Sequence, residues 1–186
     1  MPKKAPRDSA SATLAAKARA RAIALHNQGH EVEAIAAFRA ILASQPNDPV
    51  ALYSMAGLLI KRDLAEAQAM AERGVAAAPR FAPMWFARGM VMQTLGHKDE
   101  ALRSYEQALT LQPSYAEAFV NCGAVLRELH RHEEALERFN QALAIDPKHE
   151  SALGNAGILL SEFKRTDQAI ATFKRVLAHN PDYPYG

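Results

Sequence analysis

Five prolines recur at an almost constant interval along the chain. Pro46, Pro79, Pro113, Pro147 and Pro181 follow a period of about 34 residues, with only the first interval one residue shorter. A fixed period in this range is typical of a protein built from stacked repeats, in which each repeat buries its apolar face only against its neighbours. The period therefore predicts one extended repeat domain, without a single central core.

Other positions recur in the same frame, counted back from each proline. Twelve residues upstream stands an alanine in all five repeats: Ala34, Ala67, Ala101, Ala135 and Ala169. Eight residues upstream stands a large apolar residue in four repeats, with Ala71 as the exception: Phe38, Tyr105, Phe139 and Phe173. Near twenty-four residues upstream stands a small residue: Ala22, Ala56, Gly89, Gly123 and Gly157. Small residues let two helices approach closely, and the aromatic ring fills the space beside them.

These columns resemble the tetratricopeptide repeat, whose pattern over about 34 residues is W-x2-L-G-x2-Y, then A-x3-F, then P. The copy that runs from Trp85 through Gly89, Ala101 and Tyr105 to Pro113 matches best. The resemblance implies an all-α fold, a right-handed superhelical solenoid of five helix-turn-helix repeats. We expect the repeats near 15–48, 49–81, 82–115, 116–149 and 150–182, within a repeat domain that covers residues 13–182. Residues 1–12 are expected to be a disordered basic tail, and residues 183–186 a C-terminal tail or a truncated linker.

Hydrophobic periodicity places two helices in each repeat. The first helices are expected near 15–28, 49–61, 82–95, 116–129 and 150–163, and the second near 31–44, 65–77, 99–111, 133–145 and 167–179. Asp99 and Asp167 are expected as N-caps. Gly29 and Gly96 are expected in left-handed turns, where His130 and Lys164 stand in the fourth and fifth repeats.

The second repeat departs most from the pattern. Ala71 replaces the aromatic residue, Gly74 replaces an alanine, and the Lys61–Leu64 turn is one residue short. Less apolar area would be buried there, so we expect local fraying or a changed superhelical angle near residues 61–75.

Several classes of function find no support in the sequence. It has no Gly-rich phosphate loop, nucleophile elbow or converging metal ligands, so we expect no enzyme, no metal and no cofactor. The segment from Met1 to His30 carries six lysines and arginines, but no aromatic side chain interleaves them, which argues against nucleic-acid binding. No stretch approaches the ~20 apolar residues that cross a bilayer. The single Cys122 is expected in the core, and with no secretory signal the chain is expected in the cytoplasm.

The tetratricopeptide resemblance implies that the first helix of each repeat lines a concave groove that binds an extended protein segment. The residues expected to contact such a peptide are Arg19, Tyr53, Ser54, Phe86, Met90, Gln93, Asn121, Arg127, Asn155 and Ile158. Asn121 and Asn155 stand one full period apart. Because an amide both donates and accepts, the pair is suited to gripping a peptide backbone of any sequence. Alternatively, each asparagine bonds within its own repeat.

Two further functions stay open. The asparagine column and the final residues Asn180–Gly186 are similar to the repeat region of bacterial O-linked N-acetylglucosamine transferases, which would make this chain the substrate-recruiting part of a protein O-glycosyltransferase. The last helix carries Ile170, Phe173, Val176 and Leu177 without a following helix to cover them. Such an uncapped end would favour a longer natural chain or a homodimer, and so a structural assembly module.

Overall fold

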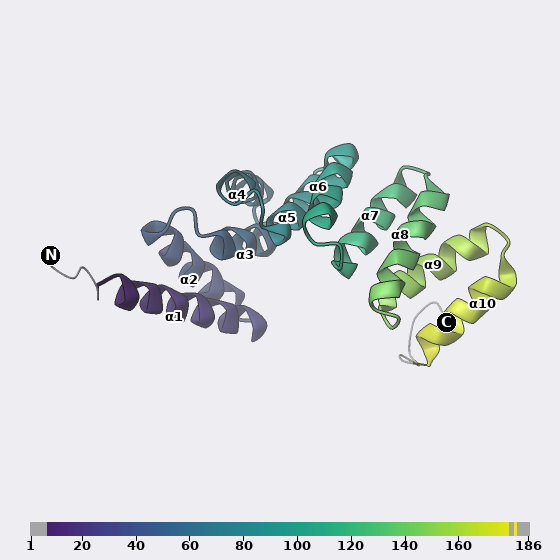
Figure 1. The fold of residues 1–186 in the computed structure, drawn as a ribbon, viewed down its shortest axis with the longest axis horizontal. Coiled ribbons are helices and arrows are strands. Elements are labelled where there is room, and N and C mark those ends of the chain that lie inside the picture. The colour runs from purple at the N-terminus through teal and green to yellow at the C-terminus, as the bar shows by residue number, and fades with distance from the viewer. Residues whose placement is uncertain (1–6, 179–180, 182–186) are drawn as a thin grey trace, which may run out of the picture. The chain divides into compact units, whose positions relative to one another are not determined.

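The computed structural model describes residues 7–178 and residue 181, with side-chain surroundings from residue 13 onward. This part of the chain contains ten α-helices and no strand (Figure 1). They are α1 (Arg7–Asn27), α2 (Glu31–Ser44), α3 (Pro49–Leu59), α4 (Leu64–Ala77), α5 (Ala82–Thr94), α6 (Lys98–Leu111), α7 (Ala116–Glu128), α8 (His132–Ile145), α9 (Glu150–Glu162) and α10 (Thr166–Leu177). The all-α helical repeat fold is confirmed.

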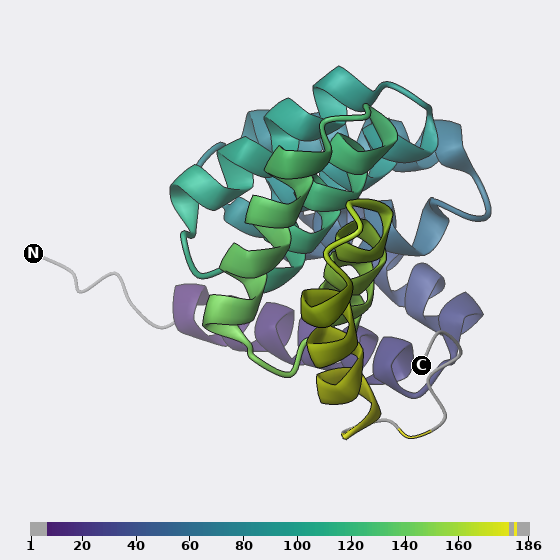
Figure 2. The ribbon, with the colours of Figure 1, turned by 90° about the vertical axis from the view of Figure 1, so that its right-hand side faces the viewer.

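The chain forms two compact units, Met1–Val91 and Met92–Gly186, which we call unit 1 and unit 2. In unit 1, α1 packs on α2, α2 on α3, and α3 on α4. In unit 2, α6 packs on α7, α7 on α8, α8 on α9, and α9 on α10, while α7 also contacts α9 (Figures 1 and 2). Helix α5 begins in unit 1 and ends in unit 2. Within each unit, helices therefore pack on their neighbours in the chain, as the sequence period requires.

The small and aromatic columns meet within a repeat. Phe139 of α8 is fully buried, and its ring lies against Gly123 of α7, where a methyl group would overlap it. The ring of Phe173 lies against Gly157 in the same way in the last repeat. Glycine is needed in this column because the aromatic ring occupies the space of a side chain.

Helix boundaries agree with the sequence at nine of the ten starts to within one residue. The exception is α1, which begins at Arg7 and includes residues 7–12, where we expected a disordered tail. The reason is that neither proline nor glycine occurs between Pro6 and Gly29, and alanine, the best helix former, is frequent there. The remainder of the expected tail, residues 1–6, and the expected C-terminal tail, residues 183–186, lie outside the described residues.

The period prolines follow the ends of the second helices. Each of Pro46, Pro79, Pro113 and Pro147 stands two residues after the last residue of its helix. A proline there cannot continue the helix, because it lacks the N–H and clashes with the preceding turn.

The expected N-caps are wrong. Asp99 and Asp167 lie inside the first turns of α6 and α10, whose cap positions hold His97 and Arg165 without a side-chain hydrogen bond. The helices begin one residue earlier than expected, so the two carboxylates stabilise the helix through its dipole instead. Aspartate side chains do cap α3 and α4, where Oδ1 of Asp48 and of Asp63 accepts a bond from the backbone three residues later, at 2.9 Å in both cases.

The left-handed turns fall where the sequence predicts them. Gly29 and Gly96 have φ of 78° and 81°, and His130 and Lys164 adopt φ of 59° and 57°. The turn inside these repeats therefore keeps the same backbone whether or not glycine is present.

In the second repeat, a neighbouring side chain explains Gly74. The Met84 side chain of α5 is fully buried and occupies the space that a methyl group on Gly74 would take. Ala71 is also fully buried. The glycine thus makes room for a long apolar side chain, and the fraying expected near residues 61–75 stays a prediction.

Candidate functional site

The ten candidate residues all lie on first helices, in two groups. Unit 1 holds Arg19 on α1, Tyr53 and Ser54 on α3, and Phe86 and Met90 on α5. Unit 2 holds Gln93 at the end of α5, Asn121 and Arg127 on α7, and Asn155 and Ile158 on α9. All of them are partly exposed except Phe86, which is 8% exposed and has little surface left for a ligand.

Arg19 is engaged by its own repeat domain. Its Nε lies 3.3 Å from Oδ2 of Asp48, although it is not aligned for a hydrogen bond. Asp48 is buried and caps α3 through its other oxygen. Because the ion pair neutralises a buried carboxylate, Arg19 joins α1 to the start of the next repeat.

Tyr53 also has a contact of its own in unit 1. Its ring meets the ring of Phe81 edge to face, with centroids 6.5 Å apart. This arrangement is favourable for aromatic rings and holds Tyr53 in a fixed orientation on the surface of α3.

In unit 2, the hydroxyl of Tyr105 organises two of the candidate amides. Tyr105 is fully buried on α6 and donates a hydrogen bond of 2.8 Å to Oε1 of Gln93. Burial raises the pKa of Tyr105 far above its usual range, and a hydrogen bond with the Asn121 side chain opposes that rise. One buried phenol therefore contacts the amides of two consecutive first helices.

A charged group extends this cluster to the end of α7. Nε2 of Gln93 lies 3.4 Å from Oε1 of Glu128, and Nζ of Lys98 lies 3.2 Å from Oε2 of the same carboxylate. The four side chains Gln93, Tyr105, Asn121 and Glu128 are thus linked, and we call them the amide cluster. Sequence reasoning missed it, although tyrosine at the only hydroxyl-bearing position of the aromatic column was a signal.

Asn155 is committed in part to its own helix. Its Nδ2 donates a bond of 2.8 Å to the carbonyl oxygen of Ser151, one turn earlier in α9. The alternative in which the asparagine bonds within its repeat therefore holds for one N–H of Asn155. In the described part of the chain, no bond to its Oδ1 is recorded.

Cys122 and the turn histidines follow the simpler interpretations. Cys122 is fully buried, and burial raises the pKa of its thiol to about 12, so the reactive thiolate is absent near neutral pH. The rings of His130 and His132 lie 5.7 Å apart, and His132 meets Phe163 edge to face at 6.3 Å. Across the described residues, no three His, Cys, Asp or Glu side chains converge as metal ligands would. None of the described helices is long and apolar enough to span a bilayer.

Family models match the second half of the chain. One described as TPR repeat matches residues 94–129, and one described as tetratricopeptide repeat matches residues 114–182. Residues 94–182 carry tetratricopeptide repeats. The sequence columns and the helix pairs continue the tetratricopeptide pattern into unit 1. No curated protein shows significant sequence similarity to the chain.

Solved structures of tetratricopeptide proteins share the fold. TTC0263 of Thermus thermophilus is 23% identical with a TM-score of 0.77, over 90% of this chain and 92% of its own. PilF of Pseudomonas aeruginosa is 18% identical with a TM-score of 0.82, over 88% and 75%. YrrB, described as a TPR protein with an unusual peptide-binding site, is 23% identical with a TM-score of 0.66, over 87% and 84%. None of these is described as a glycosyltransferase, so the resemblance to that repeat region stays a prediction.

Proposed function

We propose that this protein is a non-catalytic interaction module that binds an extended peptide along the first helices of its repeats. The tetratricopeptide matches support a protein-interaction module, and the peptide-binding site named for YrrB is consistent with this use of the fold. The finer proposal concerns unit 2, where the candidate residues stand on two helices in contact, α7 and α9.

The observation that carries the proposal is the paired position of Asn121 and Asn155. They occupy the same column of consecutive repeats, on α7 and α9, and both side chains are partly exposed. A peptide backbone needs a donor and an acceptor at regular intervals, and a side-chain amide supplies both. Oδ1 of Asn155 points to this use, because its own helix engages only Nδ2.

The amide cluster would reduce the entropic penalty of binding. Tyr105 contacts both Gln93 and Asn121, and Glu128 is held by Lys98. Side chains that are already oriented lose less conformational entropy when a ligand arrives, which raises affinity. Arg127 and Ile158, on the same two helices as the asparagines, would add charge and apolar contact.

The test uses a phage-displayed library of random peptides, selected against the whole chain. The selected peptides are then measured by fluorescence anisotropy against the double variant Asn121→Ala, Asn155→Ala. We expect affinity to fall about tenfold, since two backbone-directed hydrogen bonds are lost. Asn140→Ala at an exposed position of α8 is the matched control and should bind as the original chain does. Peptides that bind the double variant equally well would remove the asparagines from the proposal.

A second candidate is self-association through the last helix. Ile170 on α10 is 47% exposed, and Phe173 and Leu177 are only partly buried. Light scattering should then show a dimer that Ile170→Asp converts to a monomer, while the asparagine variants leave it unchanged.

A further inference from the structure

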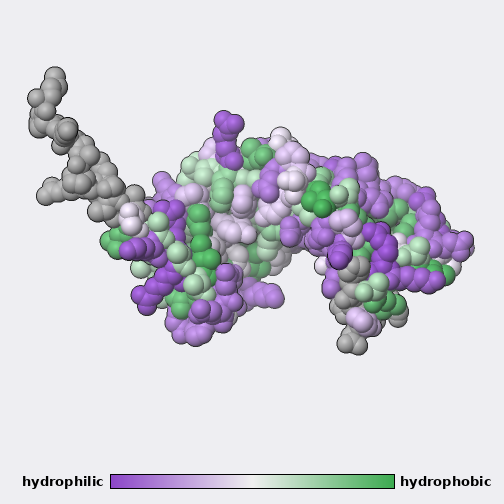
Figure 3. Space-filling view, turned by 60° about the horizontal axis from the view of Figure 1, so that its bottom comes forward, coloured by the Kyte–Doolittle hydropathy of each residue, from purple (hydrophilic) through white to green (hydrophobic). Residues whose placement is uncertain are grey.

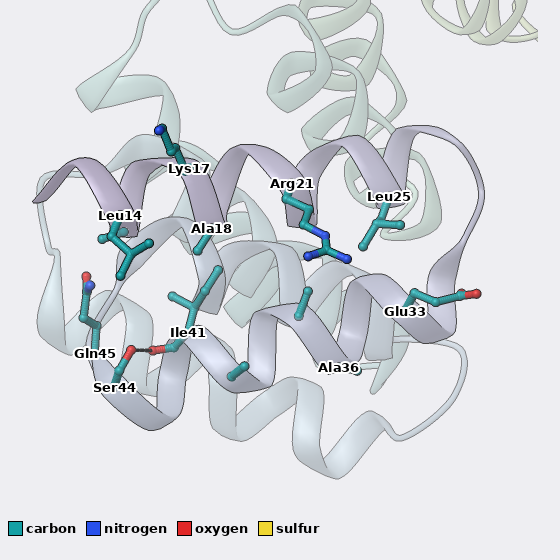
Figure 4. Close-up of a pocket in the computed structure, with 13 residues that line it drawn as sticks. Leu14, Lys17, Ala18, Arg21, Leu25, Glu33, Ala36, Ile41, Ser44 and Gln45 are labelled. Carbon is teal, nitrogen blue, oxygen red and sulfur yellow. Dashed lines mark hydrogen bonds between the residues drawn. The ribbon is translucent and has the colours of Figure 1, made fainter. Parts of the chain in front are cut away.

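A groove of about 900 Å³ lies between α1 and α2 at the start of the repeats (Figure 4). Alanines of both helices line it, among them Ala18 and Ala36, and Leu14 and Leu25 line it further along α1. Arg21 reaches from α1 towards α2 across its width. Hydrophobic side chains are visible on this end of unit 1 in Figure 3, and Leu14 is 71% exposed.

In the later repeats, the same face of the first helix is buried. Lys17, which lines the groove, stands in a column whose other members are Ala51, Met84, Ala118 and Ala152, all fully buried. Repeat 1 therefore presents to solvent a face that the other repeats cover, and it carries lysine where they carry apolar residues. Such a face is suited to receive a helix, with basic groups at the contact.

Repeat 3 shows what satisfies an arginine on this face. Arg88 stands in the column of Arg21, and its Nε lies 2.9 Å from Oε1 of Glu72 on α4, the helix that ends the preceding repeat. Beside this pair, Met84 packs over Gly74 of the same helix. The partner of this column is thus a helix with a small residue for close approach and a carboxylate two residues before it.

The two basic residues of the groove lack such a carboxylate. Over the described residues, no ion pair or hydrogen bond engages the side chain of Lys17 or Arg21. Glu33, at the edge of the groove, lies 3.8 Å from His30 instead. The groove therefore combines an alanine floor with unneutralised positive charge.

We propose that this groove is a docking site for an amphipathic helix of a partner protein that carries glutamate or aspartate beside small apolar residues. The helix would pack on the alanines, and its carboxylate would pair with Arg21 as Glu72 pairs with Arg88. The surface is separate from the asparagines of the proposed peptide site, which belong to unit 2.

Charge argues against a second copy of this chain as the occupant. If α10 of another copy stacked on the groove as α4 meets α5, the column of Glu72 would place Lys174 against Arg21. The column of Gly74 would place the larger Val176 at the point of close approach. Like charges and lost space both disfavour head-to-tail stacking. Residues 1–6 carry Lys3 and Lys4, which have the same sign as the groove.

The probe for the experiment is a peptide of the α4 sequence, residues 64–77, held helical by a staple on the face opposite Glu72. Fluorescence anisotropy measures its binding to the whole chain, and circular dichroism checks that each variant folds. We expect saturable binding that Arg21→Glu weakens about fivefold or more. A probe carrying Glu72→Lys should regain affinity for Arg21→Glu, because the two charges are exchanged. Ala18→Trp should block the groove and abolish binding.

Arg103→Glu, on an exposed position of α6, is the matched control, since it changes the net charge by the same amount. Absence of saturable binding to the folded chain would overturn the proposal. So would equal weakening by Arg21→Glu and Arg103→Glu without rescue by the exchanged probe. A dimer in light scattering that Arg21→Glu dissociates would assign the groove to a second copy and also overturn it.

Discussion

A methyl group built on Gly123 would lie 2.7 Å from Cε1 of Phe139, closer than side chains approach. Gly123→Ala therefore forces the buried ring of Phe139 to move, although alanine is the better helix former. We expect the free energy of unfolding to fall by about 1–3 kcal/mol, the usual effect of overpacking a core. Chemical denaturation followed by circular dichroism measures it.

Gly57→Ala is the matched control with the opposite expected sign. Gly57 is exposed near the end of α3, and a methyl group there meets no atom within 4 Å. Alanine should therefore raise the free energy of unfolding by about 0.5–1 kcal/mol. If both substitutions stabilise the protein, the contact with Phe139 does not explain the glycine.

The same column shows how far the sequence predicts this fold. A proline period, an alanine column and an aromatic column place nine helix starts to within one residue, because each repeat obeys the same packing rules. The start of α1 and the caps at Asp48 and Asp63 escape these rules, since they depend on local competition between side chains and backbone.

The candidate site is less predictable from the sequence than the fold. The repeat frame puts all ten candidate residues on first helices, but it does not say which side chains are already engaged. Arg19 pairs with Asp48, and Phe86 is buried, both through contacts with residues that the pattern leaves free to vary. The bond from Tyr105 to Gln93 likewise depends on one hydroxyl in an otherwise phenylalanine-rich column.

Stability should decrease in alkaline solution because of Cys122. Burial raises the pKa of its thiol from 9.0 to about 12, so the folded state holds the proton while the unfolded state releases it above pH 9. The free energy of unfolding should then fall by about 1.4 kcal/mol per pH unit between pH 9 and 12, and the contribution is fully present below pH 9. Tyr105, whose pKa is also raised by burial, steepens the fall once its unfolded form ionises, above pH 10.

Cys122→Ala isolates the thiol, because Ala156 fills the same column in the next repeat. Urea unfolding at pH 8, 9 and 10 should show a flatter pH dependence for this variant than for the original chain. Identical slopes would mean that the thiol is not shielded from solvent.

The turn at Lys164 offers a stabilising substitution. Lys164 adopts a φ of 57°, in the same left-handed region as Gly96 at this place in repeat 3. A side chain in this region costs roughly 1 kcal/mol relative to glycine. Lys164→Gly should therefore raise the midpoint of thermal unfolding, and Gly96→Ala should lower it. A lower midpoint for Lys164→Gly would show that the lysine side chain contributes more than its backbone strain removes.

The pair of Arg19 and Asp48 decides whether Arg19 serves the fold or a ligand. Asp48 both caps α3, through its bond to the Ala51 N–H, and faces Arg19 at 3.3 Å. Asp48→Ala should lower the free energy of unfolding by about 1–2 kcal/mol, because it removes the cap and leaves the arginine without its partner. Asp48→Asn keeps the capping oxygen and removes only the charge.

A double-mutant cycle with Arg19→Ala and Asp48→Asn then measures the ion pair alone. The Arg19 side chain is 34% exposed, so solvent screening limits the expected coupling to about 0.5–1 kcal/mol. Arg19→Ala should cost less stability in the Asp48→Asn background than in the original chain. If the two effects simply add, Arg19 does not hold Asp48, and its guanidinium is available for the peptide contact that the sequence predicts.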